Sequence, residues 1–256
     1  MDSARTAGAI TVSIVSHGHG PLITALLQDL AALPEPARIL LTYNIPESET
    51  HIPPELVPRI TVVNNPRPAG FATNHNAAFR KCDTEFFCVM NPDVRVPSNP
   101  FPVLLSSVHV PGVALAAPAV LNPEGELEST GRAFPTVSRL VVKAASGFDG
   151  GVSFRLGESP VRPDWVAGML LLLRSDAFAS VGGFDEKFHL YYEDVDLCAR
   201  LRNAGYELVL CPAATVVHAA RRSSHRQPRF MAWHLQSMLR YFLRHAGRLP
   251  VRRPIG

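Results

Sequence analysis

Three carboxylates stand within four positions of the segment YYEDVDLCARL, residues 191–201: Glu193, Asp194 and Asp196. Carboxylates ahead of an apolar helical pattern can cap free backbone N–H groups, ligate a metal ion or act as a general base in a cleft. On a helical wheel of 100° per residue, Asp194 projects into the apolar stripe, whereas Asp196 falls outside it. The three acids are therefore not equivalent, and they do not predict a single metal cluster.

Each of these acids has its own interpretation. Asp196 lies four residues before Arg200, so we expect an exposed ion pair worth a few tenths of a kcal/mol. Asp194 points toward the protein at a helix N-terminus, where it serves either as a cap or as a base. Glu193 lies at the edge of the apolar stripe and could take either role.

A further acid follows a buried strand. The segment FCVMNPDVRV (87–96) delivers Asp93 through a proline-fixed turn to the end of the strand, where open α/β sheets bind their ligands. Asp93 suits a hard cation such as Mg²⁺ or Mn²⁺ together with substrate phosphates, or it is an ordinary turn residue. His218 ends a later strand, and it is either a metal ligand or a hydrogen-bonded structural histidine.

The elements that must position these side chains alternate between strands and helices. Apolar runs predict strands at 10–16, 38–43, 60–64, 85–91 and 113–120. A period near 3.6 residues predicts helices at 22–33, 69–81 and, more weakly, 101–108. This alternation predicts an α/β fold in which a largely parallel sheet is covered by helices on both faces.

The second half of the chain is expected to continue this pattern. It begins with a polar, turn-rich stretch at 122–132 and a mobile loop at 146–154. The elements expected after these are a long buried strand over 164–175, a short helix capped by Ser175, a helix from Glu193 that ends at Gly205, and short strands at 206–212 and 214–220.

We expect one domain over residues 1–220 and a basic helical tail over residues 221–256. The tail helix, 230–246, has an apolar face formed by Met231, Leu235, Met238, Leu239, Phe242 and Leu243. Nine of the 25 basic residues and none of the 22 acidic residues lie in 219–256. Such a tail indicates either an anionic partner, for example a phosphate group or an anionic membrane face, or a solvated Arg-rich helix.

Sequence motifs disfavour several classes of enzyme. The sequence has no GxxxxGK[ST] or GxSxG motif, which disfavours P-loop proteins, kinases and α/β-hydrolases. The segment HGHGPL (17–22) lacks the third glycine of GxGxxG, which disfavours a dinucleotide-binding protein. The four cysteines show neither zinc-ligand spacing nor a disulfide framework. The apolar runs are too short for a signal peptide or a membrane span, so we expect a cytoplasmic protein.

Taken together, several segments resemble the bacterial family 2 glycosyltransferases of the GT-A fold, and most closely their rhamnosyltransferase branch. The resemblance covers residues 10–246. The segments that carry it are NNPRPAGFATNHNAAF (64–79), VMNPDVRV (89–96), residues 165–218 with GGFDE and YYEDVDLCARL, and RYFLRH (240–245). It implies a Rossmann-like, mostly parallel central sheet flanked by helices, followed by a C-terminal amphipathic helix.

The resemblance also implies roles for individual residues. Asp194 matches the general base, with Glu193 as the alternative. Asp93 matches the metal position of the family's DXD-like motif, Asn91 stands where many relatives have a first Asp, and His218 matches a late histidine near the metal or diphosphate. The implied cofactor is Mg²⁺ or Mn²⁺. Residues implied to contact the nucleotide-sugar are Ser16, Asn44, Gly70, Asn76, Asn91, Asp93, Trp165 and Gly168.

Two departures from the family bear on the donor. The first strand ends in SHGHG instead of an Asn-Tyr-Asn type of turn, and the second strand ends in Tyr43-Asn44 instead of Asp-Asn. Because that Asp commonly contacts the nucleotide base, the base preference is open. The leading donor is dTDP-L-rhamnose, and UDP-sugars are the alternative.

The resemblance implies an enzyme: an inverting glycosyltransferase that moves a sugar to a glycan or lipid-linked acceptor in cell-surface polysaccharide synthesis. Two other functions stay open: a catalytically silent GT-A domain that binds nucleotide or a partner, and a nucleotidyltransferase. No nucleic-acid partner is expected. Through its Arg-rich tail, in particular Arg240 and Arg244, the protein would contact the inner face of the cytoplasmic membrane.

Overall fold

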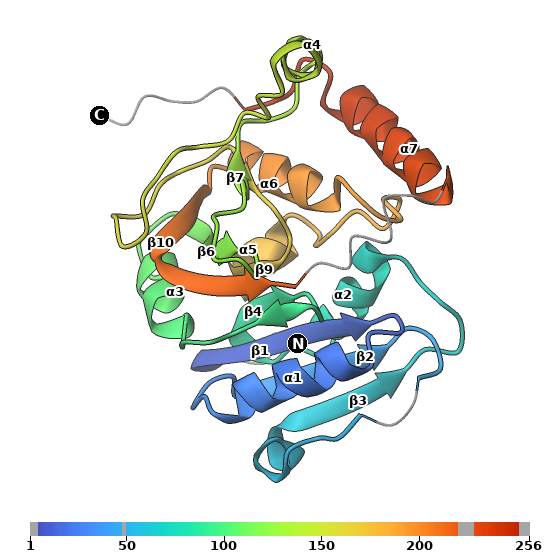
Figure 1. Ribbon diagram of the computed structural model, residues 1–256, viewed down its shortest axis with the longest axis vertical. Helices are drawn as coiled ribbons and strands as arrows, with labels where there is room; N and C mark the ends of the chain where they lie inside the picture. Colours follow the sequence, from blue (N-terminus) through green and yellow to red (C-terminus); the bar gives the residue numbers. More distant parts are fainter. Residues whose placement is uncertain (1–4, 48–49, 220–227, 251–256) are drawn as a thin grey trace.

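The computed structural model describes residues 5–47, 50–219 and 228–250, which form an α/β fold (Figure 1). Its strands are β1 (Thr6–Ser16), β2 (Arg38–Tyr43), β3 (Ile60–Asn64), β4 (Thr84–Met90), β5 (Val94–Arg95), β6 (Val113–Leu121), β7 (Gly131–Arg132), β8 (Trp165–Val166), β9 (Leu170–Arg174) and β10 (Glu207–His218). Its helices are α1 (Pro21–Ala31), the 3₁₀-helix η1 (Pro54–Arg59), α2 (Phe71–Phe79), α3 (Phe101–Val108), α4 (Val137–Ser146), α5 (Ser175–Ser180), α6 (Glu193–Asn203) and α7 (Pro228–His245).

Eight strands form one sheet in the order β3-β2-β1-β4-β9-β6-β10-β5. The strands β3, β2, β1 and β4 are parallel, and β10 is parallel to β6. Strand β9 runs antiparallel between β4 and β6, and the short β5 runs antiparallel to β10. The prediction of a largely parallel sheet is confirmed, and its parallel strands end at one edge, where α/β folds bind ligands.

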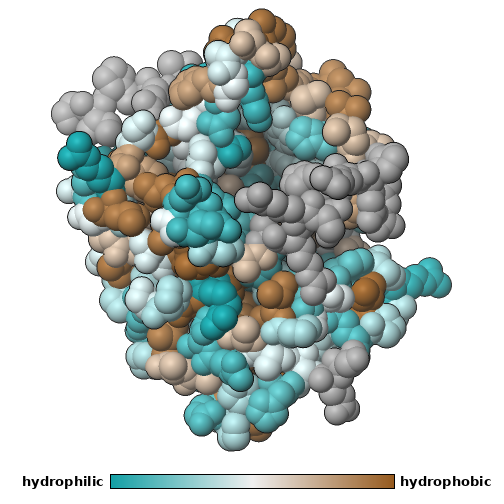
Figure 2. Space-filling view, viewed as in Figure 1, coloured by the Kyte–Doolittle hydropathy of each residue, from teal (hydrophilic) through white to brown (hydrophobic). Residues whose placement is uncertain are grey.

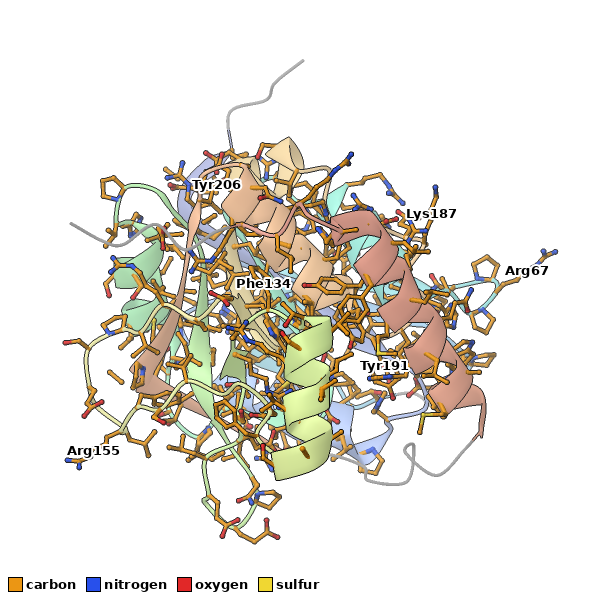
Figure 3. The ribbon with its side chains drawn as sticks, turned by 90° about the horizontal axis from the view of Figure 1, so that it is seen from above. Arg67, Phe134, Arg155, Lys187, Tyr191 and Tyr206 are labelled. Atoms are coloured by element: carbon orange, nitrogen blue, oxygen red, sulfur yellow. The ribbon has the colours of Figure 1, made fainter. Side chains whose placement is uncertain are left out.

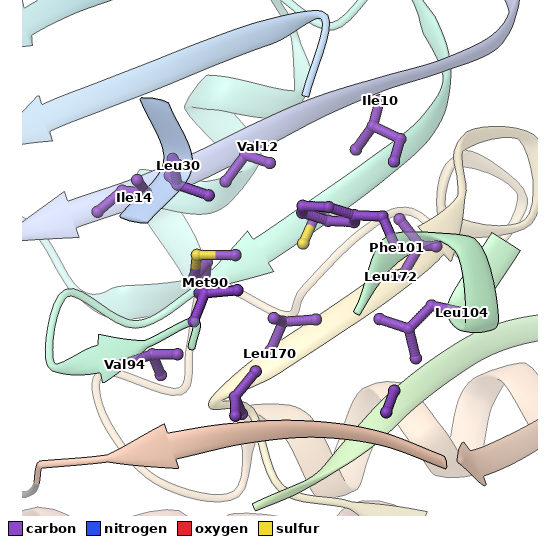
Figure 4. Close-up of a cluster of buried hydrophobic side chains, with 14 of the residues drawn as sticks. Ile10, Val12, Ile14, Leu30, Met90, Val94, Phe101, Leu104, Leu170 and Leu172 are labelled. Atoms are coloured by element: carbon purple, nitrogen blue, oxygen red, sulfur yellow. The ribbon is translucent and has the colours of Figure 1, made fainter. Parts of the chain in front are cut away.

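Two clusters of buried apolar side chains cover the two faces of this sheet. On one face, alternate residues of β1, namely Ile10, Val12 and Ile14, lie in a cluster with Leu30 of α1 (Figure 4). Their exposed fractions are at most 1%, and burial of each such side chain contributes about 1.5–3 kcal/mol relative to exposure. This packing holds the sheet edge that carries the loops of the site.

The prediction of one long strand over 164–175 is wrong. The chain forms β8, which pairs with β7 in a separate two-stranded sheet, and then β9 in the main sheet. Between them, Ala167 donates its N–H to the Thr130 carbonyl (2.8 Å), and the Met169 carbonyl accepts from Asn91 (2.8 Å). An apolar run shows burial but not register, so it did not reveal that two sheets share the segment.

Two other boundaries differ from the prediction. Ser175 is the first residue of α5 and not its cap, because β9 stays paired as far as Arg174, which occupies the cap position without a side-chain hydrogen bond. The two short strands expected after residue 205 form the single strand β10, since pairing with β6 resumes after an irregularity between Cys211 and Thr215. Residue 220 lies outside the described residues.

Helix α4 was not predicted. It begins after Thr136, whose hydroxyl accepts a hydrogen bond from the Arg139 N–H (3.2 Å), and it ends at Gly147 with a φ of 75°. These are ordinary capping signals, but the helix buries none of its residues. Residues 147–154 have no regular structure apart from a bridge at Gly151, in keeping with the predicted loop.

The predicted tail helix is confirmed as α7. Helix α6 ends at Asn203, two residues before Gly205, whose left-handed backbone (φ 90°) stops the helix as expected. Helix α7 packs against the main body, since the Tyr241 side chain is fully buried. The proposed division at residue 220 stays a prediction. No described helix is both long and apolar enough to span a bilayer.

Candidate active site

Helix α6 begins directly after two consecutive residues with left-handed backbone. Tyr191 and Tyr192 have φ angles of 69° and 65°, a conformation that bulky residues rarely adopt and that costs of the order of 1–3 kcal/mol each. The turn that they form sets the direction of the first turn of α6, which carries Glu193 and Asp194. Such backbone strain is common at functional sites, and nothing in the sequence indicated it.

Asp194 is half-buried and is fixed by two backbone N–H groups. Its Oδ2 accepts from Gly168 (3.1 Å) and its Oδ1 from Val195 (2.8 Å). Burial raises the pKa of Asp194 above its ordinary value, although these hydrogen bonds act in the opposite direction. The carboxylate is thus both a partner of helix N–H groups and a base whose proton affinity is increased.

Glu193 is more deeply buried, with 7% of its surface exposed, and its Oε2 has no hydrogen-bond partner among the described residues. Burial, followed by the negative charge of Asp194, raises its pKa well above the ordinary range. At neutral pH we therefore expect Glu193 to be protonated and Asp194 to be the ionised member of the pair.

Asp194 lines a cavity of about 300 Å³. Aromatic side chains form much of its wall, and Arg132 lies 5.5 Å from the centre of the Trp165 ring. Tyr191 lies between α4 and α7 when the molecule is seen from above (Figure 3), and residues of both helices contribute to the wall. A cavity with aromatic faces, a base and cations suits a sugar acceptor that carries an anionic group.

Asp93, His218 and Glu128 form a second cluster. The His218 Nε2 lies 3.5 Å from an Asp93 oxygen, and its Nδ1 lies 3.2 Å from a Glu128 oxygen. Burial alone would lower the pKa of His218, but the two carboxylates raise it above its ordinary value. Burial alone would raise the pKa of Asp93, but the hydrogen bond and charge of His218 lower it. Glu128 was missed because it lies in a stretch expected only to form turns.

Strand pairing brings Asp93 and His218 together. The two-residue strand β5 pairs with the end of β10, so that His218 stands opposite Val94, and the Ala219 N–H donates to the Asp93 carbonyl (2.9 Å). One short antiparallel ladder thereby closes a loop of 124 residues between the two side chains. Sequence spacing could not indicate this contact, because it depends on a long-range register.

Asp93 has the properties of a cation ligand. Its Oδ1 is buried and has no hydrogen-bond partner among the described residues. In that same part of the chain, no three His, Cys, Asp or Glu side chains converge as a complete metal-binding group, and the His218 ring separates Asp93 from Glu128. The residues fit a Mg²⁺ or Mn²⁺ ion that takes one or two protein ligands and completes its shell with phosphate oxygens.

The segment between β8 and β9 joins the two acidic sites. Gly168 donates its N–H to Asp194, while the carbonyl of the next residue, Met169, accepts from Asn91 in the turn that carries Asp93. Asn91 itself is partly exposed, and no side-chain hydrogen bond of it is seen within the described residues. The predicted base and the predicted metal ligand therefore flank one short crossing segment.

Several other predicted binding residues have structural partners. The Asn44 amide bonds to Asn65, Ala69 and Asn74, and so ties the end of β2 to the start of α2. The Asn76 amide accepts from the Phe184 N–H (3.0 Å) and donates to its carbonyl (2.8 Å). Their proposed contact with a nucleotide-sugar stays a prediction, and these bonds leave the amides little free capacity.

Gly70 has a steric role. A Cβ atom at this position would lie 2.8 Å from the His189 carbonyl oxygen, a distance that real Cβ atoms do not tolerate. The Phe71 N–H donates to the same carbonyl (3.2 Å). The glycine thus allows α2 to approach the segment that leads into Tyr191 and Tyr192, whether or not it also contacts a nucleotide.

Ser16 donates its hydroxyl to Glu47 (2.8 Å), which also accepts from the N–H groups of Gly18 (2.7 Å) and Gly20 (3.3 Å). A carboxylate therefore occupies the glycine-rich turn after β1. Burial alone would raise the pKa of Glu47, but these hydrogen bonds outweigh it and lower the pKa below its ordinary value. The group is therefore ionised at neutral pH. Glu47 was not predicted, since its loop carries no motif.

Asp196 forms the predicted ion pair with Arg200 (2.7 Å), but the expectation that this pair is exposed is wrong. Its side chain has 0% exposure, because α7 covers it with Arg244 (3.1 Å) and His245 (2.9 Å). The helical wheel of α6 placed Asp196 outside the helix's own apolar stripe and could not show that another helix packs there.

Comparison with known proteins agrees with this geometry. Residues 46–154 match the model of the family described as glycosyl transferase family 2, and residues 159–225 match that described as the N-terminal domain of galactosyltransferase. The chain is 27% identical over 251 residues to the rhamnosyltransferase WbbL of Escherichia coli, covering 92% of this chain and 93% of that one.

A second relative is the N-acetylglucosaminyl-diphospho-decaprenol L-rhamnosyltransferase of Mycobacterium tuberculosis, with 32% identity over 181 residues. That alignment covers 66% of this chain and 59% of the mycobacterial protein, so a large part of the mycobacterial protein lies outside the alignment.

Solved structures share the fold at low sequence identity. The mannosyltransferase PcManGT of Pyrobaculum calidifontis, in complex with GDP-Man and Mn²⁺, has a TM-score of 0.65 and 17% identity, and the match covers 99% of this chain and 68% of that one. TarS of S. aureus has a TM-score of 0.64 and 10% identity, covering 95% and 40%. The predicted GT-A fold is confirmed, and the family-model match and the relatives together support a family 2 glycosyltransferase near the rhamnosyltransferase branch.

Proposed function

We propose that this glycosyltransferase inverts the anomeric centre as it moves L-rhamnose from dTDP-L-rhamnose to a lipid-linked or glycan acceptor of cell-surface polysaccharide. The observation that carries this proposal is Asp194, a carboxylate of raised pKa at the wall of a sugar-sized cavity, fixed by the Gly168 N–H. The names of the two rhamnosyltransferase relatives support the choice of sugar.

In this reaction Asp194 is the general base. It takes the proton of the acceptor hydroxyl while the hydroxyl oxygen attacks the anomeric carbon on the face opposite the nucleotide. The bond between that carbon and the diphosphate oxygen breaks, and its electron pair leaves with the diphosphate. The Gly168 and Val195 N–H groups hold the carboxylate in place without neutralising it.

The leaving diphosphate requires positive charge at the end of β4. Asp93 and His218 would hold a divalent ion there, and a bound Mg²⁺ or Mn²⁺ would offset the charge that develops on the diphosphate. Asp93 and Glu128 raise the pKa of His218, so binding of the ion would release any proton held by the imidazole nitrogen that ligates it.

The cavity wall supports an acceptor that carries phosphate. Trp165 and Tyr191 offer aromatic faces for a sugar ring, and the basic side chains of Arg132, Arg139 and Lys143 lie at the same wall. The diphospho-decaprenol in the mycobacterial relative's name has this chemistry. We place the reaction at the cytoplasmic face of the membrane, where nucleotide-sugars meet lipid-linked acceptors.

The test is a donor panel. The purified protein is incubated with dTDP-L-rhamnose, UDP-glucose or GDP-mannose, each with Mg²⁺ or Mn²⁺, and thermal stabilisation and release of the nucleoside diphosphate are measured. We expect both signals to be largest with dTDP-L-rhamnose and to need the metal. Binding without turnover, even with a lipid-diphosphate-sugar acceptor, would indicate a silent domain, and pyrophosphate release from dTTP and a sugar 1-phosphate would indicate a nucleotidyltransferase.

A further inference from the structure

Helix α7 presents its apolar stripe to the outside of the molecule. Met231, Leu235, Leu239 and Leu243 recur every fourth residue, and their exposed fractions lie between 51% and 72%. The opposite side of the helix is buried and contains polar groups: Ser237 donates to the Leu190 carbonyl (2.9 Å). This arrangement is the reverse of an ordinary surface helix, which turns its apolar stripe toward the core.

Arg240 and Arg244 of α7 point inward as well. Both Arg240 and Arg244 pair with Asp185, and Arg244 also pairs with Asp196. Their guanidinium groups are therefore committed to carboxylates of the main body. The expectation that these two arginines bind a membrane is not supported by this geometry, and the surface that they leave outside is apolar.

Helix α4 has the same property. It buries no residue, and Val137, Val141 and Val142, together with Phe148 just beyond the helix, are between 47% and 69% exposed. We call these four side chains and the four of the α7 stripe the apolar rim. They account for eight of the 13 large apolar side chains that are exposed in the described part of the chain.

The two halves of the rim lie on the same side of the molecule, on either side of the cavity. Leu140 and Lys143 of α4 and His234 and Met238 of α7 line the cavity that contains Asp194. Figure 3 shows both helices on the upper surface, and Figure 2 shows hydrophobic surface at the top, over α4, and at the upper right, over α7. The apolar side chains thus lie on the two helices that flank the cavity.

The charge of this surface is one-sided. The chain has 22 acidic residues, but neither α4 nor α7 contains an Asp or a Glu. Helix α4 contains the basic residues Arg139 and Lys143. Lys143 forms no ion pair with a described carboxylate. Arg139 pairs with Asp164 (3.7 Å), and Asp149, which follows Phe148, pairs with Arg132 (3.0 Å), so Lys143 supplies the uncompensated positive charge. Exposed apolar side chains next to such a cation match the interface of a bilayer that contains anionic lipids.

We propose that the apolar rim inserts into the interfacial layer of an anionic phospholipid membrane and so turns the cavity entrance toward the lipid surface. A second copy of the chain is the less suitable occupant, because a protein packed on the rim would cover the entrance that a substrate must pass. Attachment through the rim does not depend on which sugar the enzyme transfers.

The test uses vesicle sedimentation with the full-length protein. Vesicles contain phosphatidylcholine either alone or mixed with phosphatidylglycerol, and the variant is Leu235→Gln/Leu239→Gln, which keeps good helix formers on an exposed face. We expect the wild type to prefer the anionic vesicles and the variant to bind them about tenfold less tightly or weaker still, since two apolar side chains lose their burial. The pair Val137→Gln/Val141→Gln should weaken binding in the same direction.

The matched control is Val57→Gln/Val110→Gln, which changes two exposed apolar residues outside the rim and should bind like the wild type. Equal vesicle binding by the wild type and the rim variants overturns the proposal. So does a wild-type dimer in light scattering that the rim variants dissociate while no form of the protein binds vesicles. Turnover of a water-soluble acceptor should be the same in all variants, so a failure of the proposed reaction is seen separately.

Discussion

At the scale of single residues, the site depends on how two adjacent acids divide their roles. Glu193 is the more buried, and its pKa is raised further, so it holds a proton at a pH where Asp194 is ionised. An ionised carboxylate that is held by N–H groups but kept out of bulk water lowers the stability of the fold and is a better proton acceptor. Substitution of each acid by its isosteric amide tests whether Glu193 and Asp194 differ in this way.

Asp194→Asn should lower kcat by about 10²–10⁴-fold and leave donor affinity nearly unchanged, because general bases contribute on that scale. Glu193→Gln resembles the protonated acid and should leave kcat nearly unchanged. Steady-state kinetics with both variants provides the measurement. Wild-type turnover in the first variant, or equal losses in both, would contradict the assignment.

The pH dependence follows from the raised pKa of Asp194. A general base must be deprotonated, so kcat/KM should fall as the pH decreases through this raised pKa, above the range of an ordinary Asp. Because the folded pKa exceeds the unfolded one, the ionised group destabilises the fold at neutral pH, and the cost disappears as the pH falls toward the unfolded pKa. Asp194→Asn should accordingly raise the Tm at pH 7 more than it does at pH 4.

Asp93→Asn tests the proposed metal ligand. The variant keeps the size of the side chain but removes the charge on the buried Oδ1 that lacks a partner. We expect donor affinity measured by calorimetry with Mn²⁺ to fall to the value that the wild type shows without Mn²⁺. If the wild type binds the donor equally with and without the ion, Asp93 has no such role.

At the scale of elements, α7 is held against the start of α6 and the preceding loop by buried ion pairs and by the packing of Tyr241 and Phe242, while its apolar stripe stays exposed. Asp196 has no exposed surface and is shared by Arg200 of its own helix and by Arg244 and His245 of α7. Tyr192, which directly precedes α6, also packs on the α7 residue Tyr241 at 5.3 Å between ring centres. The contacts of α7 therefore reach the turn that directs Asp194.

Asp196→Asn should destabilise the protein by about 3 kcal/mol, because it leaves buried cations without their carboxylate. Urea unfolding at pH 7 provides the measurement, and Asp83→Asn, which breaks the exposed pair with Arg38, should cost less than about 1 kcal/mol.

The pKa of Asp196 is lowered despite its burial, so its stabilisation is present above pH ~3.8 and is lost as the pH falls through the folded pKa. Equal costs for the two variants would contradict a stabilising role of the buried Asp196 contacts with α7.

At the scale of the whole molecule, stability is unevenly distributed. Central strands such as β4 and β9 consist almost entirely of buried residues, whereas α4 buries none. Local unfolding costs little free energy where few apolar contacts are lost. The site thus combines a stable sheet edge with the helix α4, which can unfold locally while the sheet stays folded.

Hydrogen exchange followed by mass spectrometry should show this contrast. The amides of β4 and β9 should exchange only by global unfolding, and those of α4 should exchange much faster by local opening. Addition of anionic vesicles should slow the exchange of α4 and α7 and leave η1 unchanged. Protection of α4 equal to that of β4 in the free protein would contradict the view of α4 as an independent wall.

The sequence by itself determined the order and type of most elements, because apolar periodicity and glycine and proline punctuation are local properties. The strands at 38–43 and 60–64 and the helix at 101–108 agree with the structure to the residue. The sequence also identified Asp93, Asp194 and His218 as candidate site residues, since each stands at the end of an element where ligands bind.

Only the tertiary structure decided how those residues meet and what surrounds them. The contact of His218 with Asp93 and Glu128, the burial of Asp196 under α7 and the outward apolar stripe of α7 all arise between segments far apart in the chain. A helical wheel shows which residues share a face but not which face the protein covers. That choice depends on packing and pairing register, which become defined only when the whole chain is folded.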